Sequence, residues 1–163
     1  MATSLFQPVD AAHRQLAQAL MKDAKFAALA VNDPETKTPF VSRVALGLAT
    51  DGVPVSLVSQ LAQHTRALQA DASCALLIGE PGAKGDVLSH PRLTLQARAE
   101  FVDRVGPEHA EMAAQYLRGH PKSKLYLSLG DFGFVRFVPI RAFLNGGFGK
   151  AFQLAPNDLK PGL

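Results

Sequence analysis

The chain has 163 residues, of which 47% are hydrophobic, and this length and composition fit one compact domain spanning residues 1–163. Its 17 Lys and Arg residues only slightly outnumber its 14 Asp and Glu residues and form no basic run, so we expect no nucleic acid as partner. The first residues lack the pattern of a signal peptide and no apolar run has the length of a membrane span, so we expect a cytoplasmic protein with no membrane partner.

The first third of the chain predicts one helix followed by a strand. Asp10 is suited to cap a helix that extends to about Met21. Residues 26–31 are predicted to form a buried strand, and residues 33–39 are rich in turn-forming side chains. Four apolar residues at helical spacing predict the buried face of the helix: Ala12, Leu16, Ala19 and Leu20.

A second strand contains Arg43 and has two different faces. Arg43 lies on the same face as the small residues Ala45 and Gly47, whereas the opposite face is apolar. Residues 50–52 predict a tight hairpin into a strand that contains Val55. Three consecutive antiparallel strands are therefore expected.

Residues 59–66 place polar and cationic side chains where the third strand is followed by a helix. The first turn of a helix has unpaired N–H groups and the positive end of the helix dipole, so this position suits a phosphate group, which Thr65 and Arg66 would help to bind. The guanidinium of Arg43 can hold a phosphate through two parallel hydrogen bonds, and the small residues beside it let a flat ring approach the backbone. Together the two segments predict a phosphorylated ligand with a ring.

The remaining segments add further strands and one more helix. Cys74, the one cysteine of the sequence, lies in a predicted strand and is expected to be a buried structural thiol. A loop over residues 80–91 leads to the clearest strand, residues 92–101, in which apolar and polar side chains alternate. Pro107 opens a helix, and a last strand starts near Phe132. The expected buried face of this helix consists of Ala110, Ala113, Ala114 and Leu117.

This order of elements predicts a mainly β fold of the α+β class. Five or six strands joined mostly by hairpins, with few helices between them, favour an antiparallel barrel over a doubly wound parallel sheet. The helices are expected to cover the ends and edges of the barrel.

Five segments between about Phe26 and Phe152 occur in the order typical of one family: residues 43–46, 59–66, 91–95, 130–134 and 146–149. They resemble the pyridoxamine phosphate oxidase-like FMN-binding proteins and, within that superfamily, most closely the haem-utilisation branch. The resemblance implies an antiparallel split β-barrel that forms a homodimer. It also implies FMN in clefts at the subunit interface, with a small-molecule substrate or electron donor on the exposed ring face.

Carried over position by position, the resemblance implies a set of FMN ligands. Arg43 would bind the phosphate, and Val44 and Ala45 would lie beside the isoalloxazine ring. The phosphate and ribityl end would also contact Ser59, His64, Thr65 and Arg66, and the next long strand would add Arg92 and Thr94. No catalytic residue is assigned, because the flavin itself supplies the redox chemistry.

The expected function is therefore that of an FMN-binding flavoprotein, an FMN-dependent oxidoreductase with an unassigned substrate. A haem-binding or haem-degrading protein on the same fold is one alternative. Against it, no histidine follows His120 to serve as an axial haem ligand near the C-terminus. A non-catalytic flavin carrier is the other alternative.

Several of these residues also have purely structural explanations. Arg43 taken alone is typical of a solvated surface residue, His64 of a helix start and Thr65 of a helix cap. Residues 146–149 taken alone predict a strand-ending turn. The other histidines lack the paired spacing of metal ligands, so we expect no metal site: His13, His90, His109 and His120.

Overall fold

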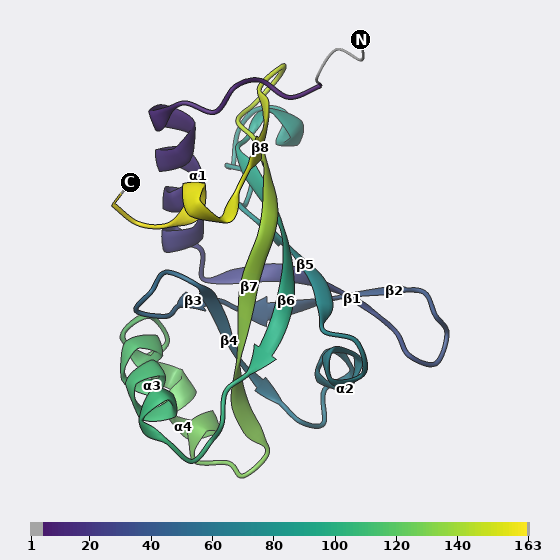
Figure 1. Ribbon diagram of the computed structural model, residues 1–163, viewed down its shortest axis with the longest axis vertical. Coiled ribbons are helices and arrows are strands. Elements are labelled where there is room, and N and C mark those ends of the chain that lie inside the picture. The colour runs from purple at the N-terminus through teal and green to yellow at the C-terminus, as the bar shows by residue number, and fades with distance from the viewer. Residues whose placement is uncertain (1–4, 163) are drawn as a thin grey trace.

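Eight strands form one antiparallel sheet in the computed structural model, which describes residues 5–162 (Figure 1). The strand order is β2-β1-β5-β6-β7-β4-β3, and β8 pairs with β7. The strands are β1 (Phe26–Asn32), β2 (Pro39–Ala45), β3 (Gly47–Leu48), β4 (Pro54–Ser59), β5 (Ser73–Ile78), β6 (Arg92–Phe101), β7 (Phe132–Asn145) and β8 (Ala151–Leu154).

The two edges of the sheet meet, which closes it into a barrel. β2 and β3 stand at opposite ends of the strand order, yet only Leu46 separates them in the chain, so the sheet must curl until its edges are neighbours. The Ser56 hydroxyl on β4 donates a hydrogen bond to the Ala45 carbonyl on β2 across this closure, at 2.7 Å. The expected antiparallel split barrel is confirmed.

Four α-helices in the described residues lie around this barrel: α1 (Ala11–Asp23), α2 (Gln63–Ala70), α3 (Pro107–Gly119) and α4 (Lys124–Leu127). Figure 1 shows α1 beside the C-terminal segment, α2 against the strands near β1, and α3 with α4 at the other end. Short 3-10 turns occur at Val87–Ser89, Pro121–Ser123 and Pro156–Leu159. None of the helices within residues 5–162 has both the length and the apolarity to cross a membrane.

The start of α1 is as predicted, and its buried face is as predicted only in part. The Asp10 side chain accepts a hydrogen bond from the His13 backbone N–H at 2.9 Å, so Asp10 is the N-cap. Ala17 and Met21 are the buried residues of α1, whereas Ala12 and Ala19 are exposed. Leu16 and Leu20 are partly buried and pack against the core as predicted. The prediction was wrong for the two alanines because alanine contributes little apolar area, so the larger side chains determine which side of the helix faces the core.

The same correction applies to α3, which starts at Pro107 as expected. Met112 and Tyr116 are its buried residues, while Ala110 and Ala114 are exposed. The Tyr116 ring packs edge-on against Phe134 of β7, with ring centroids 5.3 Å apart. An aromatic side chain buries several times the area of an alanine, and this difference decides the orientation of the helix.

The inner face of the sheet forms the main core. The alternation predicted for β6 is confirmed from Leu93 to Ala99, but Phe101 is 38% exposed. The strand ends at Phe101, and Val102 is buried in its place, with its N–H bonded to the Phe134 carbonyl. Side chains that are fully buried in the core include Leu29, Leu76, Leu93, Leu95, Phe137 and Leu144.

A glycine-rich turn follows β7 and leads to a strand that was not expected. Residues 146–149 connect β7 to β8, and Gly147 and Gly149 have φ values of +121° and +72°, which glycine adopts without strain. The prediction of a turn at this glycine-rich segment is confirmed. The estimate of five or six strands was wrong because β3 and β8 are too short to show a clear alternation of side chains.

Candidate cofactor-binding site

The structure brings the two predicted ligand-binding segments together. Ser42 on β2 and His64 in the first turn of α2 are 22 residues apart in the chain, and Ser42 Oγ is hydrogen-bonded to His64 Nδ1 at 3.0 Å. Arg43 follows Ser42 directly, and Thr65 and Arg66 follow His64. The junction of β2 and α2 therefore carries most of the predicted ligand residues.

Arg43 and Ala45 lie on the outer face of β2, opposite to the core. The Arg43 guanidinium lies over the Phe26 ring, with its central carbon 5.2 Å from the ring centroid, and it forms no hydrogen bond or ion pair within residues 5–162. Val44 points the other way and is buried, so a ligand would reach only its backbone. Arg43 is free to bind an anion on the outer face.

The first turn of α2 leaves polar groups without partners. Its N-cap residue, Ala62, has no side chain that can accept a hydrogen bond, so Thr65 is not a cap as its structural explanation proposed. Thr65 is completely buried, and its hydroxyl has no hydrogen-bond partner among the described residues. Arg66 is exposed, and its guanidinium has no polar partner within residues 5–162. A buried unpaired hydroxyl costs about 1–3 kcal/mol, and such groups in native proteins call for an explanation, of which a ligand is one.

His64 differs from the other histidines in its surroundings. The ring is half-buried, and burial lowers its pKa, so the imidazole is neutral at pH 7. The bond to Ser42 orients the ring through Nδ1, and Nε2 has no partner in the described part of the chain. A neutral imidazole oriented through one nitrogen is the usual form of a histidine that ligates a metal through the other.

The other histidines have contacts that explain them. His13 is bonded to Asp10 at 2.6 Å, and His90 Nε2 lies 2.9 Å from the Lys84 carbonyl. His120 Nε2 donates to the Leu46 carbonyl at 2.7 Å, and His109 packs near the Phe134 ring. No group of three or more metal-ligating side chains is present within residues 5–162.

The Ser59 hydroxyl already has hydrogen-bond partners within the chain. Its hydroxyl donates to Asp131 Oδ2 at 2.6 Å and accepts from the Leu61 N–H at 3.1 Å. These bonds connect the end of β4 to the segment before β7. Asp131 and Ser42 were not among the predicted site residues, although each lies in or beside a segment that carries the family resemblance.

Arg92 and Thr94 are not part of this cluster. Both lie on the outer face of β6, which is separated from β2 by β1 and β5, a distance of about 14 Å at ordinary strand spacing. Arg92 donates a hydrogen bond to the Leu88 carbonyl at 3.0 Å. Thr94 lies in the same cross-strand row of the outer face as Arg43, so only an elongated ligand could contact both residues within one chain.

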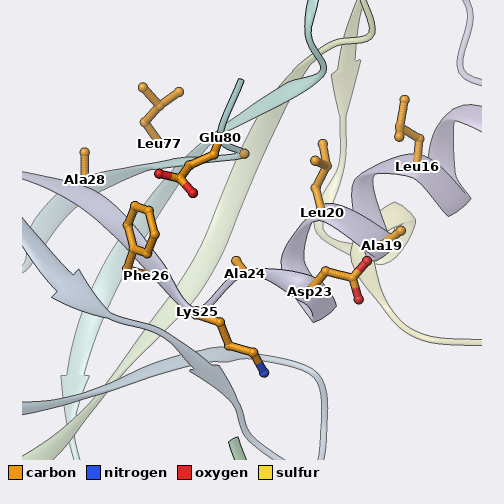
Figure 2. Close-up of a pocket in the computed structure, with 11 residues that line it drawn as sticks. Leu16, Ala19, Leu20, Asp23, Ala24, Lys25, Phe26, Ala28, Leu77 and Glu80 are labelled. Carbon is orange, nitrogen blue, oxygen red and sulfur yellow. The ribbon is translucent and has the colours of Figure 1, made fainter. Parts of the chain in front are cut away.

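An apolar pocket of about 460 Å³ lies where the second half of α1 meets the outer face of β1 and β5 (Figure 2). We call it the apolar pocket; its wall includes Leu16, Leu20, Phe26, Ala28 and Leu77, with Asp23, Lys25 and Glu80 at the rim. It shares Phe26 with the Arg43 contact described above. The outer face therefore combines apolar surface with an unpaired guanidinium.

Comparisons with known proteins show what this chain is similar to. No protein-family model matches the sequence. The chain is 34% identical over 114 residues to the non-canonical heme oxygenase HOZ, chloroplastic, of Arabidopsis thaliana, covering 70% of this chain and 34% of that protein. A solved heme binding protein from Mycobacterium smegmatis is 28% identical, with a TM-score of 0.83 over 93% of this chain and 61% of that chain.

A structure with lower sequence identity shows the same fold. It is a protein of the pyridoxinephosphate oxidase family from Clostridium acetobutylicum, related to general stress protein 26, with 15% identity and a TM-score of 0.70 over 93% of this chain and 99% of that chain. The chain therefore has the split-barrel fold of the pyridoxamine phosphate oxidase-like proteins. It spans about a third of the length of its curated relative and less than two thirds of the haem-binding structure.

Proposed function

We propose that this split-barrel protein binds haem, with His64 as the axial ligand of the iron. The observation that carries the proposal is the state of this side chain: a half-buried neutral imidazole, oriented by Ser42 through Nδ1, with Nε2 unpaired. Haem iron is commonly held by a histidine nitrogen. The lack of a histidine after His120 therefore does not count against haem, because this ligand lies at the β2–α2 junction.

A cationic side chain next to His64 suits a ligand that carries carboxylates. Arg66 follows His64 in the first turn of α2, is exposed, and has no ion-pair partner within residues 5–162, whereas Arg43 projects from the opposite, outer face of β2. Guanidinium groups pair well with carboxylates such as the two propionates of haem. The two named haem proteins among its relatives support haem more directly than flavin, which reverses the order expected from the sequence.

A second copy of the chain would complete the site. The outer face presents small side chains at Ala28, Ala30 and Ala75 together with Leu77, which is 47% exposed. A sheet face of this kind suits close packing against an identical face, so the proposal includes a homodimer. In that dimer Arg92 and Thr94 would serve a site formed with the partner.

A haem titration followed by absorbance tests the proposal. We expect a shifted Soret band at one haem per chain, and we expect His64→Ala to weaken binding about tenfold or more because the iron loses its protein ligand. His109→Ala is the matched control and should bind like the parent protein. A His64→Ala variant with the parent's affinity and Soret position would rule out His64 as the ligand.

FMN is the second candidate, favoured by the unpaired Thr65 hydroxyl at the uncapped start of α2. Backbone N–H groups and the helix dipole at this position favour a phosphate, and Arg43 and Arg66 would add charge. FMN would make the protein an oxidoreductase or a flavin carrier. Titration with FMN, followed by a test of reduction by NADH or NADPH in the presence of an acceptor, separates these two roles. No uptake of FMN would reject both.

A further inference from the structure

The first turn of α2 has no cap of its own. Its N-cap residue, Ala62, has no side chain that accepts a hydrogen bond, and the N–H groups of Gln63 and His64 have no acceptor among the described residues. Uncapped helix ends fray unless contacts outside the helix hold them. The place of His64 therefore depends on residues 59–62, the segment that leads into α2.

Asp131 holds this segment from the chain that precedes β7. Its Oδ2 atom accepts the Ser59 hydroxyl at 2.6 Å, and Ser59 Oγ in turn accepts the Leu61 N–H at 3.1 Å. The Asp131 backbone carbonyl accepts the Gln60 N–H at 2.8 Å. Asp131 therefore binds the connection between β4 and α2 through both its side chain and its backbone.

Asp131 is itself held in place on both sides. The guanidinium of Arg104, in the loop between β6 and α3, donates to the Leu129 carbonyl at 3.2 Å and also to the Gly130 carbonyl. These two residues directly precede Asp131, and Phe132, which follows it, is the first residue of β7. Asp131 can therefore act as a fixed anchor for the start of α2.

The need to end β4 does not explain the side-chain bond between Asp131 and Ser59. Ser59 is already paired with Phe132 in the ladder between β4 and β7. The Asp131 carboxylate is half-buried and has no ion-pair partner within residues 5–162. A hydrogen bond to a carboxylate is about twice as strong as one between neutral groups. Its contribution falls on the segment after the strand, where Ser59 accepts the next free N–H.

We propose that Asp131 is a positioning residue for the ligand site at the β2–α2 junction, because through Ser59 it fixes the start of α2 and with it the place of His64. Ser42 sets the direction of the imidazole at 3.0 Å, and Asp131 sets the backbone that carries it. The inference deepens the proposed function, and its ligand measurement rests on haem binding at His64. Ser59, expected to contact the ligand, acts on it through the helix start.

Hydrogen–deuterium exchange of the ligand-free protein tests the positioning itself. Asp131→Ala should speed exchange of residues 61–66 about tenfold or more, while exchange in β6, which reports global unfolding, stays the same. Asp131→Asn keeps an oxygen that accepts the Ser59 hydroxyl, so it should restore most of the protection. Asp71→Ala, which removes the side-chain bonds at the other end of α2, is the matched control and should leave residues 61–66 unchanged.

Two exchange results would overturn the proposal. Exchange of residues 61–66 at the parent's rate in Asp131→Ala would mean that Asp131 does not hold the start of α2. An equal increase in β6 would mean that Asp131 only stabilises the fold as a whole.

Haem titration of the same variants tests the consequence for the ligand. Asp131→Ala should weaken haem binding about tenfold and move the Soret band toward that of His64→Ala, because the imidazole is no longer held in one place. Asp131→Asn should recover both properties, and Asp71→Ala should bind like the parent protein. Unchanged affinity and Soret position in Asp131→Ala would overturn the proposal. A parent protein that binds no haem would reject the proposed function instead, and the exchange measurement would then decide the role of Asp131.

Discussion

The inner and outer faces of the sheet come from alternate residues of the same strands, and they differ in what they contact. On the inner face, Leu29, Leu76 and Phe137 are completely buried. On the outer face, Leu77 and Arg43 remain exposed, and no helix of the described chain covers Arg43. The inner residues therefore determine the stability of the fold, while the outer residues are available to contact a ligand or a partner.

The largest expected effect compares two phenylalanines of β7. Phe137 lies on the inner face and is 0% exposed, whereas Phe143 lies half-buried on the outer face. Phe137→Ala should lower the free energy of unfolding by about 3–5 kcal/mol, because it removes buried area and leaves a cavity. Phe143→Ala should cost clearly less. Urea unfolding of both variants measures the difference, and equal losses would contradict the division between the faces.

The next effect concerns ligand affinity on the outer face. Arg43→Ala should weaken FMN binding by about 1.5–3 kcal/mol if its guanidinium pairs with the phosphate. The free energy of unfolding should change by less than about 0.5 kcal/mol, because Arg43 is exposed. Fluorescence titration with FMN provides the affinity, and Arg98→Ala is the control. Unchanged affinity in Arg43→Ala would remove Arg43 from the site.

A third prediction uses a polar side chain buried on the inner side. Thr65→Val replaces the unpaired hydroxyl by a methyl group of similar size, so stability should stay equal or rise by about 1 kcal/mol. FMN affinity should fall if the hydroxyl contacts the phosphate. Thermal unfolding with and without FMN measures both quantities. A clear loss of stability without ligand would mean that the hydroxyl has a partner in the folded protein.

The smallest effect concerns an ion pair between Arg14 of α1 and Asp158 of the 3-10 turn Pro156–Leu159. The Arg14 guanidinium donates to Asp158 at 2.7 Å and lowers the pKa of that carboxyl below its usual 3.8. The pair therefore stabilises the fold above pH 3.8, and this contribution is lost as pH falls through the lower pKa of the folded state. Asp158→Asn should remove this pH dependence and cost about 0–1 kcal/mol at neutral pH. Urea unfolding between pH 3 and 7 would show it, and an unchanged acid slope would argue against the pair.

The fold could be predicted largely from patterns within single elements. The alternation in β6, the cap at Asp10 and the turn at residues 146–149 depend on neighbours in the chain, and the structure agrees with all three. Helix faces were harder, because alanines on several sides of α1 and α3 gave no clear apolar stripe. Tertiary packing of Met21 and Tyr116 resolved that ambiguity.

From the sequence alone, most of the strands and turns could be placed, except the short β3 and β8, and so could the segments that carry cationic and hydroxyl groups. Tertiary packing was needed to show that Ser42 orients His64, that the Thr65 hydroxyl has no partner among residues 5–162, and that the apolar pocket forms between α1 and the outer face of β1 and β5. The physical reason is the separation along the chain over which each interaction acts. Periodicity and capping act between residues a few positions apart, whereas these contacts join distant segments and exist only once the sheet has curled and closed.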